Sequence, residues 1–97
     1  MGTLAIITWE PTGSRLKVGD LVEVEETDGS RSRVRIIASG HICRVLRDHL
    51  ALLPASATEG DPRVTSLAEE ISALLHGYAS PPEALETATA LVADVFG

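Results

Sequence analysis

Aromatic residues are almost absent from this sequence: only Trp9, Tyr78 and Phe96 occur among its 97 residues. Apolar residues nevertheless make up 44% of the chain, so a core has to be built from Leu, Ile, Val and Ala side chains. A chain of this length supports a single core. We therefore expect one domain over residues 1–97, with a thin aliphatic core that a partner or a second copy would help to stabilise.

Cysteine and long apolar runs are also scarce. Cys43 is the only cysteine, which excludes an intramolecular disulfide and a cysteine-rich zinc site. No apolar run approaches the roughly 18 residues of a membrane span, and the N-terminus lacks the basic and apolar regions of a signal peptide. These absences predict a cytoplasmic protein that does not bind a membrane.

Basic residues are missing from the C-terminal third of the chain, because the last of them is Arg63. The net charge is −6, which argues against nucleic-acid binding, since that mode needs clustered Lys and Arg to neutralise phosphates. The sequence predicts an acidic C-terminal surface and no nucleic-acid partner. The acidic residues after Arg63 are Glu69, Glu70, Glu83, Glu86 and Asp94.

Recognisable catalytic or metal-binding patterns are lacking as well. There is no glycine-rich phosphate loop and no nucleophile elbow. His41 and Cys43 lie two positions apart and would point in different directions on a helix, so they do not suggest a metal pair. We interpret His49 as a residue at the edge of the core and His76 as a residue at the C-terminal end of a helix. The sequence therefore predicts no enzyme activity, no metal and no cofactor.

Three segments of the first part of the chain have the patterns of β-strands. Leu4–Thr8 is short, apolar and β-branched, and it is followed by turn residues. Leu21–Glu26 and Arg33–Ile37 alternate between apolar and charged residues. Asp28-Gly29 between them predicts a hairpin.

The hairpin has a register that fits its side chains. Placing Val24 opposite Val34 makes one face apolar and the other a ladder of opposite charges, each pair contributing about 0.2–1 kcal/mol. The predicted pairs are Val24 with Val34, Val22 with Ile36, Glu25 with Arg33 and Glu23 with Arg35.

The remainder of the chain predicts three helices. After Gly40 the apolar period changes to that of a helix, and Ile42–Leu53 forms one stripe that Pro54 ends. Asp61-Pro62 can open a second helix that ends near His76-Gly77, and Ser66 with Glu69 offers an alternative capping box for its start. Ser80-Pro81 opens a third helix. The expected fold is α+β and winged-helix-like: a three-stranded antiparallel sheet followed by three helices, with a β-rich part over residues 1–38 and a helical part over 39–97.

DNA binding is the obvious function of a winged helix, but the charges oppose it. The third helix has no Lys or Arg and would meet phosphates with acidic side chains. Arg31, Arg33 and Arg35 could make a basic wing, yet Glu23 and Glu25 lie opposite and largely cancel it.

The chain resembles the PqqD-like leader-peptide recognition domains of ribosomal peptide biosynthesis, including the leader-binding proteins of lasso-peptide clusters. Arg33–Leu46, with Ala38-Ser39-Gly40 in its middle, is similar to their last strand, small-residue turn and first helix. Gly60–Ile71 looks like their second helix, and Tyr78–Ala84 with Leu91–Val95 looks like their third. The resemblance is one of pattern and order.

The resemblance implies a non-catalytic adaptor that presents a precursor (leader) peptide to a modifying enzyme or leader peptidase, without a cofactor. In that family an extended leader adds as a strand to the edge of the sheet and lies against the third helix. The edge here would be Arg31–Ile37, and Arg33 and Arg35 could pair with an acidic leader. The implied peptide-binding residues are Arg33, Val34, Arg35, Ile36, Leu85, Ala88, Leu91, Val92 and Val95.

Two other interpretations fit parts of the sequence. Lys17–Asp20 leading into Leu21–Val24 is a turn-then-strand pattern frequent in small barrels. It favours an SH3-like barrel with a helical tail, an interaction or RNA-contacting module with about five strands. Alternatively, the chain is the structural subunit of a homo-oligomer, for instance a homodimer that buries the apolar side of the third helix.

Overall fold

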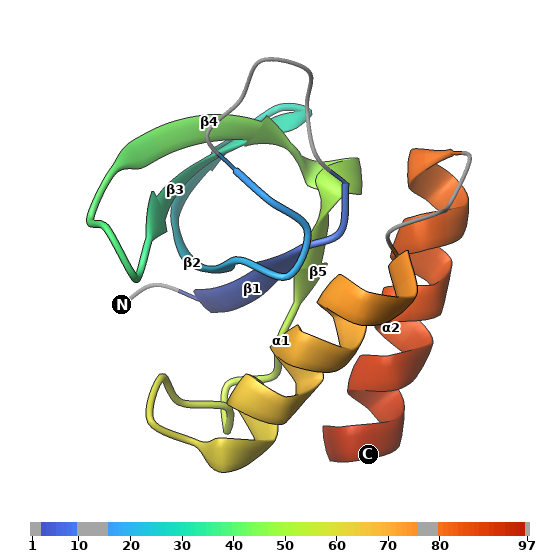
Figure 1. Ribbon diagram of the computed structural model, residues 1–97. Helices are drawn as coiled ribbons and strands as arrows, with labels where there is room; N and C mark the ends of the chain where they lie inside the picture. Colours follow the sequence, from blue (N-terminus) through green and yellow to red (C-terminus); the bar gives the residue numbers. More distant parts are fainter. Residues whose placement is uncertain (1–2, 10–15, 76–79, 97) are drawn as a thin grey trace.

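The computed structural model describes residues 3–9, 16–75 and 80–96, and it has a curled sheet with two helices against one side (Figure 1). The elements in chain order are β1 (Thr3–Ile7), β2 (Leu21–Asp28), β3 (Arg31–Ile36), β4 (Ile42–Leu46), the 3₁₀ turn η1 (Arg47–His49), β5 (Leu50–Leu52), α1 (Pro62–Leu74) and α2 (Pro81–Phe96).

The five strands form one antiparallel sheet in the order β4-β3-β2-β1-β5. The sheet curls into a half-barrel, and β4 and β5 are its two edges (Figure 1). The predicted winged-helix fold, a three-stranded sheet followed by three helices, is therefore wrong. Five strands is the number expected for the alternative, a small barrel with a helical tail.

The predicted hairpin is confirmed at most of its positions. Val24 pairs with Val34 and Val22 with Ile36, and Gly29 takes a φ of 61° in the turn. Glu23 also faces Arg35 as predicted. A bulge after Val24 places Glu26 opposite Arg33 in place of Glu25, because the bulge inserts one residue into β2.

The segment Ile42–Leu53 was expected to be a helix and instead forms β4, η1 and β5. The spacing of its apolar residues is that of one face of a helix. The same spacing also fits two short strands joined by a tight turn. Gly40, with a φ of 77°, turns the chain so that β4 pairs with β3. Strands thus continue to Leu52, well beyond the expected end of the β-rich part at residue 38.

The two remaining helices begin where the sequence predicts. Asp61 caps α1, since its side chain accepts a hydrogen bond of 2.9 Å from the Arg63 backbone N–H. The Arg63 side chain donates to the same carboxylate and holds the pKa of Asp61 below its usual value. α2 begins at Pro81, as expected. The predicted end near His76-Gly77 lies outside the described residues, and neither α1 nor α2 is long and apolar enough to cross a membrane.

Apolar side chains are buried on both sides of β1, which creates two cores. Ala5 and Ile7 point into the half-barrel, whereas Ile6 points toward the helices. The inner core consists of Ala5, Ile7, Leu16, Val22, Val34, Ile36, Val45 and Leu50. The helix-side core consists of Ile6, Ala51, Leu53, Ala57, Val64, Leu67, Ile71, Leu75, Ala84, Ala88 and Val92.

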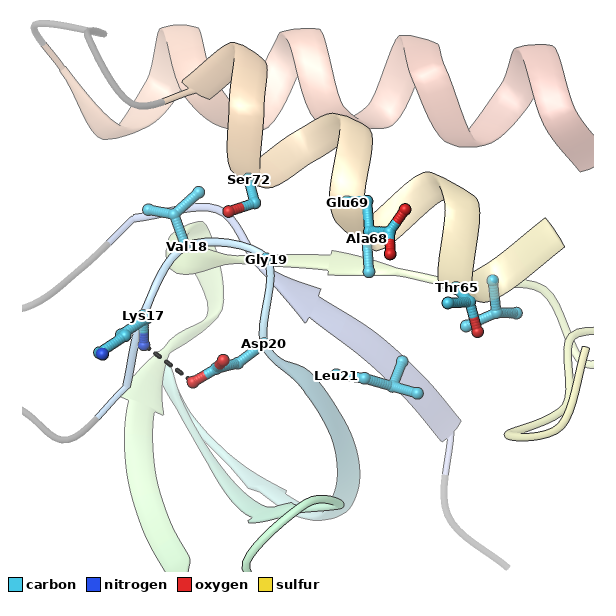
Figure 2. A pocket seen from close by; sticks show the side chains of 10 residues that line it. Lys17, Val18, Gly19, Asp20, Leu21, Thr65, Ala68, Glu69 and Ser72 are labelled. Carbon is cyan, nitrogen blue, oxygen red and sulfur yellow. Dashed lines mark hydrogen bonds between the residues drawn. The ribbon is translucent and has the colours of Figure 1, made fainter. Parts of the chain in front are cut away.

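The loop before β2 rests directly on α1 (Figure 2). Gly19 has a φ of 94°, and a Cβ atom there would lie 2.6 Å from the Ser72 Cβ and 2.9 Å from the Ala68 carbonyl oxygen. The loop is closed by Asp20, whose carboxylate accepts a 2.9 Å hydrogen bond from the Lys17 backbone N–H. Only glycine allows this approach, so the loop and α1 are in close contact at Gly19.

Candidate functional site

The sheet residues of the predicted peptide site are not on a sheet edge. β3 lies between β2 and β4, so its backbone groups already bond within the sheet and a peptide cannot add to it. Val34 and Ile36 are buried in the inner core. Arg33 and Arg35 lie on the outer face of the sheet, where they face acidic residues of β2.

The α2 residues of the predicted site belong to the other core. Ala88 and Val92 are buried in the helix-side core, and Leu85, Leu91 and Val95 pack against it partly buried. They are thus on the opposite side of the sheet wall from Val34 and Ile36. The structure does not bring the predicted sheet and helix residues together into one groove.

β4 is an edge strand with one side unpaired in the sheet. Hydrogen bonds from the Ile36 N–H to the His41 carbonyl, 2.8 Å, and from the Arg47 N–H to the Ser30 carbonyl, 2.9 Å, mark the two ends of its pairing with β3. Bonded and non-bonded pairs alternate in an antiparallel ladder. The backbone groups of the three residues Ile42, Arg44 and Leu46 therefore point away from β3.

The same three residues also expose their side chains. Ile42 is 58% exposed and Leu46 40% exposed, which makes them two of the few large apolar side chains on the described surface. Arg44 lies between them and is exposed too. We call Ile42, Arg44 and Leu46 the β4 edge. It offers apolar, basic and apolar side chains in turn, beside backbone donors and acceptors that have no partner among the described residues.

Arginines of β3 and β4 gather on the outer face of the sheet next to this edge. Arg33 lies directly opposite Arg44, a like-charge pair that destabilises a sheet. Arg33 is 3.9 Å from Glu25 and 3.8 Å from Glu26, and Arg35 is 3.1 Å from Glu23. Arg31 and Arg44 form no ion pair with any described residue. Arg31 does lie opposite Asp28 in the sheet, and both arginines line one small hollow with Glu26, Asp28 and Arg33. Arg31, Arg33 and Arg35 thus each have an acidic residue of β2 opposite them, whereas Arg44 at the edge faces only Arg33.

Sequence reasoning missed the β4 edge because it assigned Ile42–Leu46 to a helix. The usable signal was the alternation Cys43-Arg44-Val45-Leu46 directly after the Ser39-Gly40 turn. Cys43 and Val45 point inward, and Ile42, Arg44 and Leu46, which alternate with them, point outward. This alternation indicates a second β-hairpin that follows the first one along the chain.

His49, at the end of η1, has no role in the β4 edge but affects the pH dependence of stability. Its Nδ1 is buried and has no hydrogen-bond partner among the described residues. Burial lowers the pKa of His49, and this effect outweighs the raising effect of Asp48. The folded protein therefore favours the neutral imidazole.

We expect the free energy of unfolding to decrease as the pH falls from about 7 toward 5, because the unfolded chain takes up a proton near pH 6.5 that the fold resists. The slope from one such group is at most about 1.4 kcal/mol per pH unit. Urea unfolding at several pH values checks this. His49→Asn should reduce the change of the unfolding free energy with pH, and His41→Asn, at an exposed site, should not. Equal slopes in all three proteins would show that His49 is not the cause.

The described residues contain no cluster of three or more His, Cys, Asp or Glu that could hold a metal ion. The β4 edge offers hydrogen-bonding backbone, apolar contacts and positive charge, which serve binding. Comparisons of the chain with protein-family models, curated proteins and solved structures gave no match.

Proposed function

We propose that the protein is a non-catalytic adaptor that binds an extended, acidic segment of a partner protein by strand addition to the β4 edge. The observation that carries the proposal is the coincidence of free backbone groups with exposed Ile42, Arg44 and Leu46 on one edge strand. The leader of a ribosomally made precursor peptide, presented to a processing enzyme, is the partner that the sequence resemblance suggests.

Strand addition accounts for the backbone side of this site. An added strand can bond to the free N–H and C=O groups of Ile42, Arg44 and Leu46, which supplies affinity that does not depend on the peptide sequence. Its alternate side chains would lie beside those of the β4 edge on the outer face. Long edges that expose apolar residues are normally protected against pairing, and here the described residues provide no cover.

Charge accounts for the choice of peptide. An acidic side chain opposite Arg44 would balance the repulsion between Arg44 and Arg33. Apolar side chains on either side of it would cover Ile42 and Leu46. The best ligand is therefore a strand in which acidic and apolar residues alternate on the exposed face, bound more weakly at high salt.

The test is a fluorescence-anisotropy titration with a short labelled peptide in which every second residue is in turn valine and glutamate, so that both types lie on one face of the added strand, followed by leader peptides encoded beside this gene. We expect saturable binding that Arg44→Glu weakens by about tenfold or more. Ile42→Pro should weaken it as well, because proline removes a donor that faces the edge and leaves the bonds to β3 in place.

Lys17→Glu is the matched control, since it makes the same charge change at an exposed residue that lines a hollow against α1. Binding should persist in this variant, and circular dichroism should show the same fold in all of them. The proposal fails if the peptide with lysine in place of glutamate binds equally well, if Lys17→Glu is as harmful as Arg44→Glu, or if only single-stranded RNA binds.

A further inference from the structure

A second surface lies along α2, where the helix faces η1 and the end of β5. α2 contacts both elements and runs beside β5 (Figure 1). Two adjoining hollows, about 600 and 350 Å³ in volume, share Thr89 and Ala93 as lining residues. Together they form one groove, which we call the α2 groove.

The floor and walls of the α2 groove are largely apolar. Leu52, in the wall opposite α2, is 58% exposed. Along α2 the lining residues Leu85, Thr89, Ala93 and Phe96 recur every three or four positions, the spacing of one helix face. Thr89 and Ala93 are small and lie in the middle of this face, so another chain can approach α2 closely there.

The charges of the groove have one sign. Among the described residues that line it, only Asp48 on η1 and Glu86 on α2, on opposite walls, are charged. Both are exposed, and neither forms an ion pair with a described residue. Arg63 covers the Phe96 ring at 4.7 Å from its centroid, but its own charge is balanced by Asp61 at 2.7 Å.

The groove suits a helix better than an added strand. β5 has only three residues and is followed by Pro54, which has no backbone N–H. Within β5, only the backbone groups of Leu50 and Leu52 point away from β1. This edge is too short for strand addition. α2, by contrast, has 16 residues and is therefore about 24 Å long, enough to align a partner helix of several turns.

We infer that the α2 groove binds a basic amphipathic helix of a second partner, whose apolar face covers Leu52, Leu85 and Ala93 and whose Lys or Arg side chains pair with Asp48 and Glu86. A second copy of α2 is a poor occupant, because this helix carries only acidic charges. The two surfaces then have opposite preferences, an acidic strand at β4 and a basic helix at α2. Such a division would let one small domain connect two different proteins.

The test is an NMR titration of the ¹⁵N-labelled protein with a synthetic helical peptide of leucine and lysine, compared with its leucine and glutamate counterpart. We expect the lysine peptide alone to bind saturably, with shifts at 48–54 and 82–96 and none at 42–46. Glu86→Lys combined with Asp48→Lys should weaken this binding by about tenfold or more. The same double variant should gain affinity for the glutamate peptide.

Asp94→Lys is the matched control, because Asp94 is an exposed acidic residue of α2 that does not line the groove. It should bind the lysine peptide nearly as well as the unchanged protein. The inference is overturned if neither peptide binds, if Asp94→Lys weakens binding as much as the double variant does, or if sedimentation shows a dimer that Ala93→Trp dissociates. None of these outcomes bears on peptide binding at β4.

Discussion

Val34→Asp is expected to unfold the protein and not merely to block a binding site. Val34 is fully buried in the inner core, on a strand with neighbours on both sides. The substitution removes apolar contacts and buries a carboxylate without a partner. We expect a loss of more than about 4 kcal/mol, which is a large part of the stability of a small domain.

Circular dichroism and urea unfolding would measure this loss. Arg31→Asp is the control, because it introduces the same side chain on the same strand at an exposed position. It should leave the fold intact and change stability by no more than about 1 kcal/mol. A folded Val34→Asp protein with native stability would show that Val34 does not lie in a packed core.

Gly19→Ala is expected to cost about 2–4 kcal/mol. Two effects contribute. The positive φ of 94° is unfavourable for a residue with a Cβ atom. That atom would also lie 2.9 Å from the Ala68 carbonyl oxygen and 2.6 Å from Ser72, so the loop or α1 has to move.

Gly40→Ala separates these two effects. Gly40 also has a positive φ, 77°, but nothing lies within 4 Å of the position of its Cβ. It should lose only about 1–2 kcal/mol, the cost of the backbone conformation. The urea midpoints of the two variants give the difference in stability, provided that the unfolding free energy falls with urea concentration at the same slope in both. Equal losses would mean that the contact between the loop and α1 adapts without cost.

The location of the candidate site was not predictable from the sequence. Arg33 and Arg35 were identified as potential partners of an acidic peptide, and they do lie on the outer face of the sheet beside Arg44. The strand that offers its edge is β4, however, and the sequence does not show which strand ends a sheet. Edge position depends on how many strands pair, and this is a property of the whole fold.

Local sequence determined those features whose causes are local. The alternation of Leu21–Glu26 and Arg33–Ile37 defined a hairpin with most of its register, because a slip by one residue would turn Val22 and Val24 to solvent. Asp61-Pro62 and Ser80-Pro81 marked the starts of the two helices, since a cap acts within one turn.

Only the tertiary structure decided whether Ile42–Leu53 is a helix or strands. Its apolar residues satisfy either period, and pairing with β3 and β1 selected the extended form, since the free energy of strand pairing comes from residues far away in the sequence. The same pairing separated Val34 from Val92 into two cores and left β4 as an open edge. Composition alone had already set the acidic charge of the helices, and the fold placed it beside the α2 groove.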